Sequence, residues 1–349
     1  MHIGIDSFVS AVTDPDTGAV VSPEDRVAHL LEEVTRADEV GLDSFGIGEH
    51  HRSEYYDSAP TVLLAAAAAR TRRIRLNSAV TVLSADDPVR VFQDFATLDL
   101  VSRGRMDMVV GRGSFTEAFP LFGLSLRDYD SLFAEKLDLL LRIRESPTVT
   151  WSGRHRAPLT GQGVYPRPLQ EQLPIWLGVG GTPESFVRAG MLGLPLMVAI
   201  IGGQPHRFRP LVDAYREAGH RAGHPAEQLK VGLHVFGFVG DTTQQAADDF
   251  YPGWSEIFTK IAKERGGAAP TRQAYEATCG PTGAYFIGDA DTVTAKMLTV
   301  SESLGGVDRI SLQMTNVRLA HENLLHGIEL LGTEVAPAVR RQAMVAAGG

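Results

Sequence analysis

Short apolar runs typical of buried strands alternate along this chain with longer stretches whose apolar positions recur at helical spacing. The eight strand-like runs are His2–Val9, Ser44–Glu49, Ile74–Leu83, Arg105–Val110, Pro174–Val179, Leu196–Ile201, Lys230–Val239 and Arg309–Gln313. Eight strands in strict alternation with helices favour one closed (β/α)8 TIM barrel spanning residues 1–349. The alternative is an open doubly wound sheet, but no Gly-x-Gly-x-x-Gly follows the first strand.

Several helix starts carry clear signals. Ser22 and Asp87 each precede a proline, which is the arrangement of an N-cap followed by the residue best suited to the first helical position. We therefore expect helices over Pro23–Val40 and Pro88–Ser102.

Two stretches depart from the repeat. Residues Thr148–Leu173, after the fourth strand, contain Val149-Thr150-Trp151 and a Gly/Pro-rich tail, which indicates a small hairpin excursion. Residues Tyr251–Pro281, after the seventh strand, are too long for an ordinary βα connection. Long loops in compact domains are often active-site lids, so we expect Tyr251–Pro281 to be a lid loop that follows a short helix ending at Phe250.

Composition restricts the class of partner. The chain has 33 Lys and Arg against 42 Asp and Glu, a net charge of −9 at pH 7. A nucleic-acid-binding protein would favour a basic face, so we do not expect a nucleic-acid partner. The longest apolar run, Val62 to Ala69, is far shorter than the ~20 residues of a membrane span. With a single cysteine, Cys279, and no visible signal peptide, we expect a cytoplasmic protein.

Candidate chemistry first appears where the second strand ends, in Glu49-His50-His51. One hypothesis is a metal site, but neighbouring side chains of a strand point to opposite faces, so both histidines would not reach one ion while the strand continues. A second is that His50 faces the rim of the barrel and acts as an acid or base near neutral pH. The third is that the histidines are hydrogen-bonded in a packed corner.

Two glycine-rich turns follow later strands and suit an anion. In Gly111-Arg112-Gly113-Ser114 the glycines allow close approach of a ligand, and the Arg112 fork can grip a phosphate with two hydrogen bonds. In Gly180-Gly181-Thr182-Pro183 a glycine pair leads into a helix that we expect Thr182 to cap. Bare N–H groups at a helix start bind anions, so together these turns predict a phosphate site.

The third strand, Asn77–Leu83, carries no charge and contains the small residues Ser78 and Ala79. Small side chains would leave room for a flat ring against the backbone. The sequence is equally compatible with an ordinary buried strand.

These motifs, together with Tyr165-Pro166-Arg167-Pro168 and Pro174-Ile175-Trp176-Leu177-Gly178, resemble the bacterial luciferase-like flavin monooxygenase superfamily from His2 to about Arg341. The resemblance implies a (β/α)8 barrel that binds reduced FMN or, in one branch, the deazaflavin F420. It implies that the flavin phosphate is held by residues of both turns: Gly111, Arg112, Gly113, Ser114, Gly180, Gly181 and Thr182.

The same resemblance assigns further roles. It implies that Ala79–Val80 is a cis peptide packed against the flavin ring, and that His50 is the active-site histidine. In luciferase itself a cysteine lies near the flavin on the fourth strand, where this chain has Gly111. That departure argues against light-emitting chemistry, and we expect it to leave more space for a different substrate.

The resulting functional hypothesis is a two-component, FMN-dependent monooxygenase that oxygenates a small organic substrate with O2. A separate flavin reductase would supply the reduced FMN. Alternatives are F420-dependent hydride transfer on the same barrel and a flavin-binding relative without catalysis. We also expect a homodimer formed through helices Pro60–Arg70 and Pro88–Ser102, because Ala65 to Ala69 allow close helix approach and family members commonly pair there.

Overall fold

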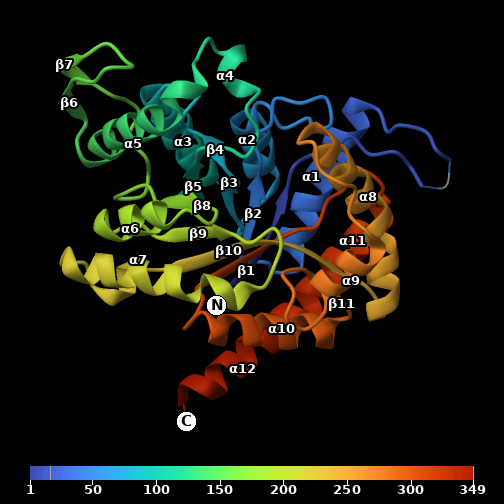
Figure 1. Cartoon of the computed structure of the whole chain (residues 1–349). Helices are drawn as coiled ribbons and strands as arrows, with labels where there is room; N and C mark the ends of the chain where they lie inside the picture. The colour runs from blue at the N-terminus through green and yellow to red at the C-terminus, as the bar shows by residue number, and fades with distance from the viewer. Residues whose placement is uncertain (16, 349) are drawn as a thin grey trace.

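The computed structural model describes residues 1–15 and 17–348 and contains a closed barrel of eight parallel strands (Figure 1). The barrel closes because β10 pairs with both β9 and β12, while β12 pairs with β1. The barrel strands are β1 His2–Ser7, β2 Ser44–Ile47, β3 Arg75–Ser78, β5 Met106–Gly111, β8 Ile175–Val179, β9 Leu196–Ala199, β10 Val231–Val239 and β12 Arg309–Gln313. The predicted TIM-barrel fold is confirmed.

Two short strands extend the barrel. The third predicted strand is interrupted at Ala79 and Val80, and it resumes as β4, Thr81–Val82, which pairs with β5. The other addition, β11 at Phe286–Gly288, pairs with the end of β10. The strand β11 was not predicted, because three residues carry too little pattern to separate a strand from a loop.

Helices surround the barrel as an outer layer (Figure 1). The principal ones are α1 Pro23–Glu39, α2 Pro60–Arg70, α3 Pro88–Ser102, α5 Tyr129–Glu145, α6 Pro183–Met191, α7 Arg209–Arg221, α10 Ala290–Ser303, α11 His321–Leu330 and α12 Ala336–Gly348. A four-residue helix, α4 Ala118–Leu121, lies between β5 and α5. The predicted caps are present: Ser22 accepts from the Asp25 N–H, and Asp87 accepts from the N–H groups of Val89 and Arg90.

The two stretches outside the repeat differ in structure. After β5 and α5, strands β6 Thr148–Trp151 and β7 Leu159–Gly163 pair antiparallel as a hairpin. The expectation of a loop over Tyr251–Pro281 is wrong. The helix α8 runs from Thr243 to Glu264 and α9 from Arg272 to Cys279, so most of this segment is helical.

The helix α8 continues past Pro252. Proline lacks the N–H that a helix interior needs and usually ends or bends the helix. Here Asn316, from the loop after β12, donates its Nδ2 to the carbonyl of Phe250 at 3.2 Å. The next residue is Gly253, and a Cβ there would collide with the Asn316 side chain. The contacts with Asn316 thus tie α8, next to Pro252, to the loop after β12.

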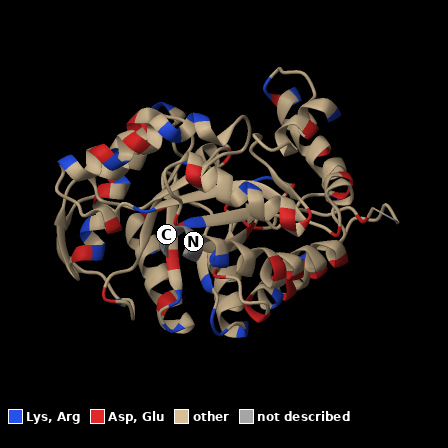
Figure 2. Cartoon of the chain, turned by 90° about the horizontal axis from the view of Figure 1, so that it is seen from below, with Lys and Arg blue, Asp and Glu red and all other residues tan. Residues whose placement is uncertain are grey.

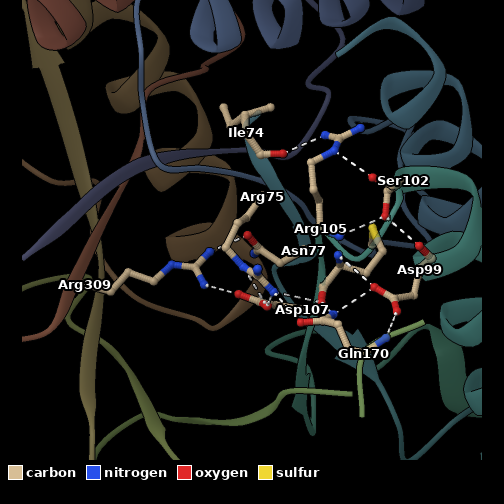
Figure 3. Close-up of polar contacts among 10 residues, drawn as sticks. Ile74, Arg75, Asn77, Asp99, Ser102, Arg105, Asp107, Gln170 and Arg309 are labelled. Carbon is tan, nitrogen blue, oxygen red and sulfur yellow. Dashed lines mark hydrogen bonds and ion pairs between the residues drawn. The ribbon is translucent and has the colours of Figure 1, made fainter. Parts of the chain in front are cut away.

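The lower part of the barrel interior contains a cluster of polar contacts (Figure 3). The buried Arg309 of β12 donates to Asp107 of β5 at 3.3 Å and to the side-chain oxygen of Asn77 on β3. Arg75 also donates to Asp107. Burying charges is costly unless they are paired and hydrogen-bonded, and here each charged group has partners. These contacts join strands on opposite sides of the barrel beneath the site described next.

Charged side chains of both signs are interspersed over the outer helices in the view from below (Figure 2). None of the helices in the described part of the chain is long and apolar enough to cross a membrane.

Candidate active site

A cavity of about 720 Å³ opens at the carboxyl ends of the barrel strands, where barrel enzymes carry their active sites. The structure brings His50 and all nine predicted cofactor-binding residues to its wall. These nine are Ala79, Val80, Gly111, Arg112, Gly113, Ser114, Gly180, Gly181 and Thr182. Residues that lie more than 130 positions apart in sequence thus face one space, because parallel strands end on the same rim.

His50 is held in place by Asp57, a residue that sequence analysis missed. The Asp57 carboxylate accepts the His50 backbone N–H at 3.1 Å, and its Oδ2 lies 2.8 Å from His50 Nδ1. Burial raises the pKa of the fully buried Asp57, while the hydrogen bonds from His50 work in the opposite direction. With Nδ1 engaged, Nε2 is the ring atom left to hold or move a proton in the cavity. No sequence pattern marked Asp57.

His51 has a different partner from His50. Its Nε2 lies 3.2 Å from Oε1 of Glu49, and Oε2 of Glu49 accepts the Val82 N–H at 2.8 Å. The hydrogen bond with Glu49 raises the pKa of His51. These contacts tie the loop after β2 to β4. Because β2 ends at Ile47, both histidines lie beyond the strand, and the alternation of strand side chains does not apply to them.

No group of three or more His, Cys, Asp or Glu side chains within the described residues is arranged to hold a metal ion. The two histidines after β2 lie in separate hydrogen-bonded pairs, each with its own carboxylate.

The two glycine-rich turns meet at Arg112. Its guanidinium donates to Ser185 in the first turn of α6 at 3.3 Å, so the end of β5 and the start of α6 lie side by side. The same guanidinium pairs with Asp130 at 2.5 Å and lies 5.2 Å from the Tyr129 ring centroid. The side chain of Asp130 is 76% exposed, so this pair lies at the surface.

The start of α6 is open toward the cavity. A Cβ added to Gly180 or Gly181 would meet no atom within 4 Å. Thr182 stands at the N-cap position, but its side chain makes no capping hydrogen bond, contrary to our expectation. Glu184, in the first turn of α6, lines an outer groove between α5 and α6 and not the cavity. Pro183 has no N–H and the Ser185 N–H donates to the Thr182 carbonyl at 3.0 Å, so an anion here would meet the N–H groups of the Gly180–Thr182 turn.

The peptide bond between Ala79 and Val80 is cis, as the resemblance implied. The Val80 side chain lies against two glycines of the barrel wall. A Cβ on Gly111 would lie 2.9 Å from Val80 Cγ2, and one on Gly178 would lie 3.0 Å from Val80 Cγ1. The expectation that Gly111 leaves extra space for a substrate is wrong, because Val80 occupies that space.

The opposite side of the cavity is apolar and aromatic. Phe236 of β10 and the α8 residues Phe250, Trp254 and Phe258 line it. The ring centroids of Phe236 and Phe258 are 5.7 Å apart, and Trp254 donates its indole N–H to Tyr285 at 2.9 Å. Because α8 was expected to end at Phe250, sequence analysis did not assign this aromatic face to the site.

A second histidine–carboxylate pair in the cavity was also missed. His234 of β10 and Asp6 of β1 both line the cavity, with Nδ1 and Oδ2 only 2.7 Å apart. The alternation of strand residues places Gly232, His234 and Phe236 on the same side of β10, a signal that could have placed His234 inside the barrel.

Comparison with known proteins gives consistent results. A family model described as luciferase-like monooxygenase matches residues 3–307. The 4-hydroxyprotoasukamycin monooxygenase of Streptomyces nodosus subsp. asukaensis is 26% identical over 323 residues, covering 86% of this chain and 83% of that protein. Matched segments span 60–86% of the lengths of the first four curated relatives.

Solved structures share the fold. The monooxygenase RslO1 from Streptomyces bottropensis superimposes with a TM-score of 0.83 at 24% identity, covering 97% of this chain and 99% of that one. The oxygenating constituent of 3,6-diketocamphane monooxygenase from Pseudomonas putida, solved with FMN, gives 0.76 at 20% identity, covering 97% and 98%. Similar structures also include F420-dependent enzymes.

Proposed function

Because this chain belongs to the luciferase-like monooxygenase family, we propose that it is a flavin-dependent oxidoreductase that uses reduced FMN and O2 to oxygenate a small organic substrate. One observation carries the proposal. The cavity holds an anion-ready corner formed by Arg112 and the Gly180–Thr182 turn, together with a carboxylate-held histidine, His50. That combination suits a phosphorylated cofactor at one end and proton handling near its ring.

The residues present fit the FMN phosphate. Arg112 offers a planar fork, Ser114 a hydroxyl, and the start of α6 offers backbone N–H groups without a side-chain cap. Gly180 and Gly181 leave room for a phosphate to approach the backbone. Asp130 would compete for Arg112, but an exposed ion pair contributes only about 0–1 kcal/mol, so a phosphate can displace it at small cost.

Reduced FMN, when bound, supplies the electrons that activate molecular oxygen. The chain's own residues would position and protect this chemistry. His50, fixed through Nδ1 by Asp57, can hold or deliver a proton at Nε2. The aromatic side chains of α8 form an apolar wall that limits access of water to the cavity. Ala79 and Val80, which line the cavity, would pack against the flavin ring.

We further propose that reduced FMN comes from a separate flavin reductase, with this chain as the oxygenating component. The support is the likeness to an oxygenating constituent solved with FMN.

F420-dependent hydride transfer is the second candidate, favoured by the F420-dependent enzymes among the similar structures. Like FMN, F420 carries a phosphate, so the corner at Arg112 does not distinguish them. A flavin-binding relative without turnover is the third candidate.

The test supplies the purified chain with a flavin reductase, NADH, FMN and O2, and screens apolar organic compounds by mass spectrometry for products heavier by one oxygen atom. Oxygenated product that depends on both FMN and this chain supports the proposal. Product formation only with F420 and no uptake of oxygen would instead establish the hydride-transfer function.

A further inference from the structure

His234 and Asp6 form a second built unit in the cavity, separate from His50 and Asp57. His234 projects from β10 and Asp6 from β1, on either side of β12. The Asp6 side chain is 3% exposed and that of His234 is 12% exposed. The other carboxylate oxygen, Asp6 Oδ1, is buried and has no hydrogen-bond partner within the described residues. The surrounding barrel residues, and not solvent, therefore keep the His234–Asp6 pair in its orientation.

His50 and His234 have the same kind of surroundings. Each has Nδ1 against a buried carboxylate, and each ring lies beside Phe8, at 4.6 Å for His50 and 5.6 Å for His234 between ring centroids. A carboxylate at Nδ1 fixes the tautomer in which that nitrogen carries the hydrogen and Nε2 accepts one. His234 therefore presents a hydrogen-bond acceptor to the cavity.

We propose that His234, oriented by Asp6, binds a hydroxyl group of the substrate, and that the substrate is an apolar ring compound bearing a phenol or alcohol. This inference rests on the proposed function, since it names the substrate class of the same site. The aromatic residues beside His234 are the reason for proposing that the rest of the substrate is an apolar ring. Phe236 follows His234 on the same face of β10, Phe258 of α8 lies 5.7 Å from Phe236 between ring centroids, and Trp254 also lines the cavity.

The negative charge of Asp6 favours a neutral hydroxyl over an anionic group on the substrate. The Asp6 carboxylate beside His234 repels a substrate carboxylate or phosphate, and the buried Arg309 below is already paired with Asp107. A neutral O–H donor meets no such penalty. If the proton moves, the substrate O–H bond breaks, its electron pair stays on oxygen, and a new N–H bond forms at His234 Nε2. The adjacent Asp6 carboxylate then stabilises the imidazolium.

The test uses two fluorescent probes of nearly equal shape, 2-naphthol and 2-methoxynaphthalene, with the purified full-length chain. Only the first has a hydroxyl donor. A net hydrogen bond contributes about 0.5–1.5 kcal/mol, so we expect 2-naphthol to bind about twofold to tenfold more tightly. His234→Phe should abolish this preference while it retains binding of the methoxy probe.

A matched control is His326→Phe, because His326 forms a histidine–aspartate pair with Asp241 at 2.7 Å but lies on α11, outside the cavity. This variant should keep the parental preference. Asp6→Asn provides a second test that preserves the volume of the side chain, and it should reduce the preference. Circular dichroism identifies any variant that fails to fold.

The proposal is overturned if the parent binds both probes equally, or if a folded His234→Phe chain keeps the preference. If His234→Phe does not fold, full preference in Asp6→Asn overturns it. Failure of the proposed function is separable, because FMN binding is measured independently by flavin fluorescence. A chain that prefers 2-naphthol but binds no flavin retains the hydroxyl site and loses the proposed monooxygenase role.

Discussion

At the scale of single residues, the proposed chemistry depends on how carboxylates orient the histidines of the cavity. Asp57 holds His50 through two contacts, one to the ring and one to the backbone N–H. The ring therefore keeps one orientation without help from a ligand. Such orientation by a buried carboxylate is the usual support for a histidine that transfers protons.

Replacement of His50 by alanine should lower turnover in the oxygenation assay by ~10²–10⁴, the typical contribution of a positioned acid or base. FMN affinity should be largely retained, because the phosphate corner lies on other elements. Asp57→Asn should lower turnover in the same direction while the ring remains present. Equal losses of FMN affinity and turnover in His50→Ala would show that His50 has a structural role.

Asp86, in the turn between β4 and α3, provides a pH-dependent test. Burial raises its pKa to about 7, and the neighbouring Glu49 carboxylate adds to the shift. Because the folded-state pKa lies above that of the unfolded chain, Asp86 favours folding only while protonated. Its contribution to stability is complete below an ordinary aspartate pKa of 3.8 and is lost as pH rises through about 7.

Asp86→Asn removes this titration. We expect the melting temperature of the variant to rise relative to the parent between about pH 5 and about pH 8, where the parent must ionise a buried group. Thermal unfolding of both chains across this range measures the difference. A difference that does not change with pH would contradict the assignment.

At the scale of elements, α8 is held over the cavity mouth by charges. Arg52, in the loop after β2, donates to Glu264 of α8 and to Glu117 beside α4, both at 2.6 Å. Lys260 of α8 pairs with Glu54 at 2.7 Å. Burial works to raise the pKa of Glu54, but the hydrogen bonds from Lys260 and Arg52 outweigh it and lower the pKa to about 2. Three elements of the rim thus meet at one ionic cluster.

We predict that α8 acts as the lid, a role that the sequence assigned to a loop. Arg52→Gln should speed hydrogen exchange in the second half of α8 while exchange in the barrel strands is unchanged, because it removes the contacts with Glu264. The matched control is Arg272→Gln, which removes ion pairs with Asp248 and Glu276. Unchanged exchange in Arg52→Gln would show that the cluster does not restrain α8.

The limits of sequence prediction appear most clearly at this scale. All eight barrel strands were predicted because each carries its own apolar run and ends in a turn signal. The extent of α8 was not, because Pro252 marks a helix end by its local pattern, and the residue that anchors α8 beside it, Asn316, is 64 positions away. The pairing of Asp6 with His234 likewise depends on closure of the barrel, which local pattern does not contain.

The cofactor corner was predictable for a different reason. Glycines next to Arg112 and before Pro183 each mark a turn after a strand, and a barrel places all such turns on one rim. The packing of side chains around the corner could not be predicted from the sequence. At Gly111, for example, the side chain of Val80 occupies the space that was expected to be open.

At the scale of the whole molecule, we predict a homodimer through α2 and α3. Both helices expose large apolar side chains: Val62 is 68% exposed and Leu100 is 45% exposed. Ala67 and Ala68 are buried within the chain, so only part of the alanine surface is available to a partner. Val62→Asp and Leu100→Asp should each shift the protein toward monomer, as measured by light scattering.

Met191→Asp on α6 is the control for the dimer, because Met191 is 61% exposed on a helix outside the predicted interface. It should leave the assembly unchanged. A monomeric parent at micromolar concentration would exclude the dimer.

The central claim is that the corner at Arg112 holds the phosphate of a flavin, and FMN fluorescence titration tests it most directly. A charge-assisted hydrogen bond contributes roughly 1.5–3 kcal/mol, so Arg112→Ala should raise the dissociation constant for FMN about tenfold to a hundredfold. Arg156→Ala is the matched control, since Arg156 is 23% exposed against 24% for Arg112 and also pairs with an aspartate, Asp87, but does not line the cavity. The account predicts weakened binding in Arg112→Ala alone, and parental affinity in that variant would contradict it.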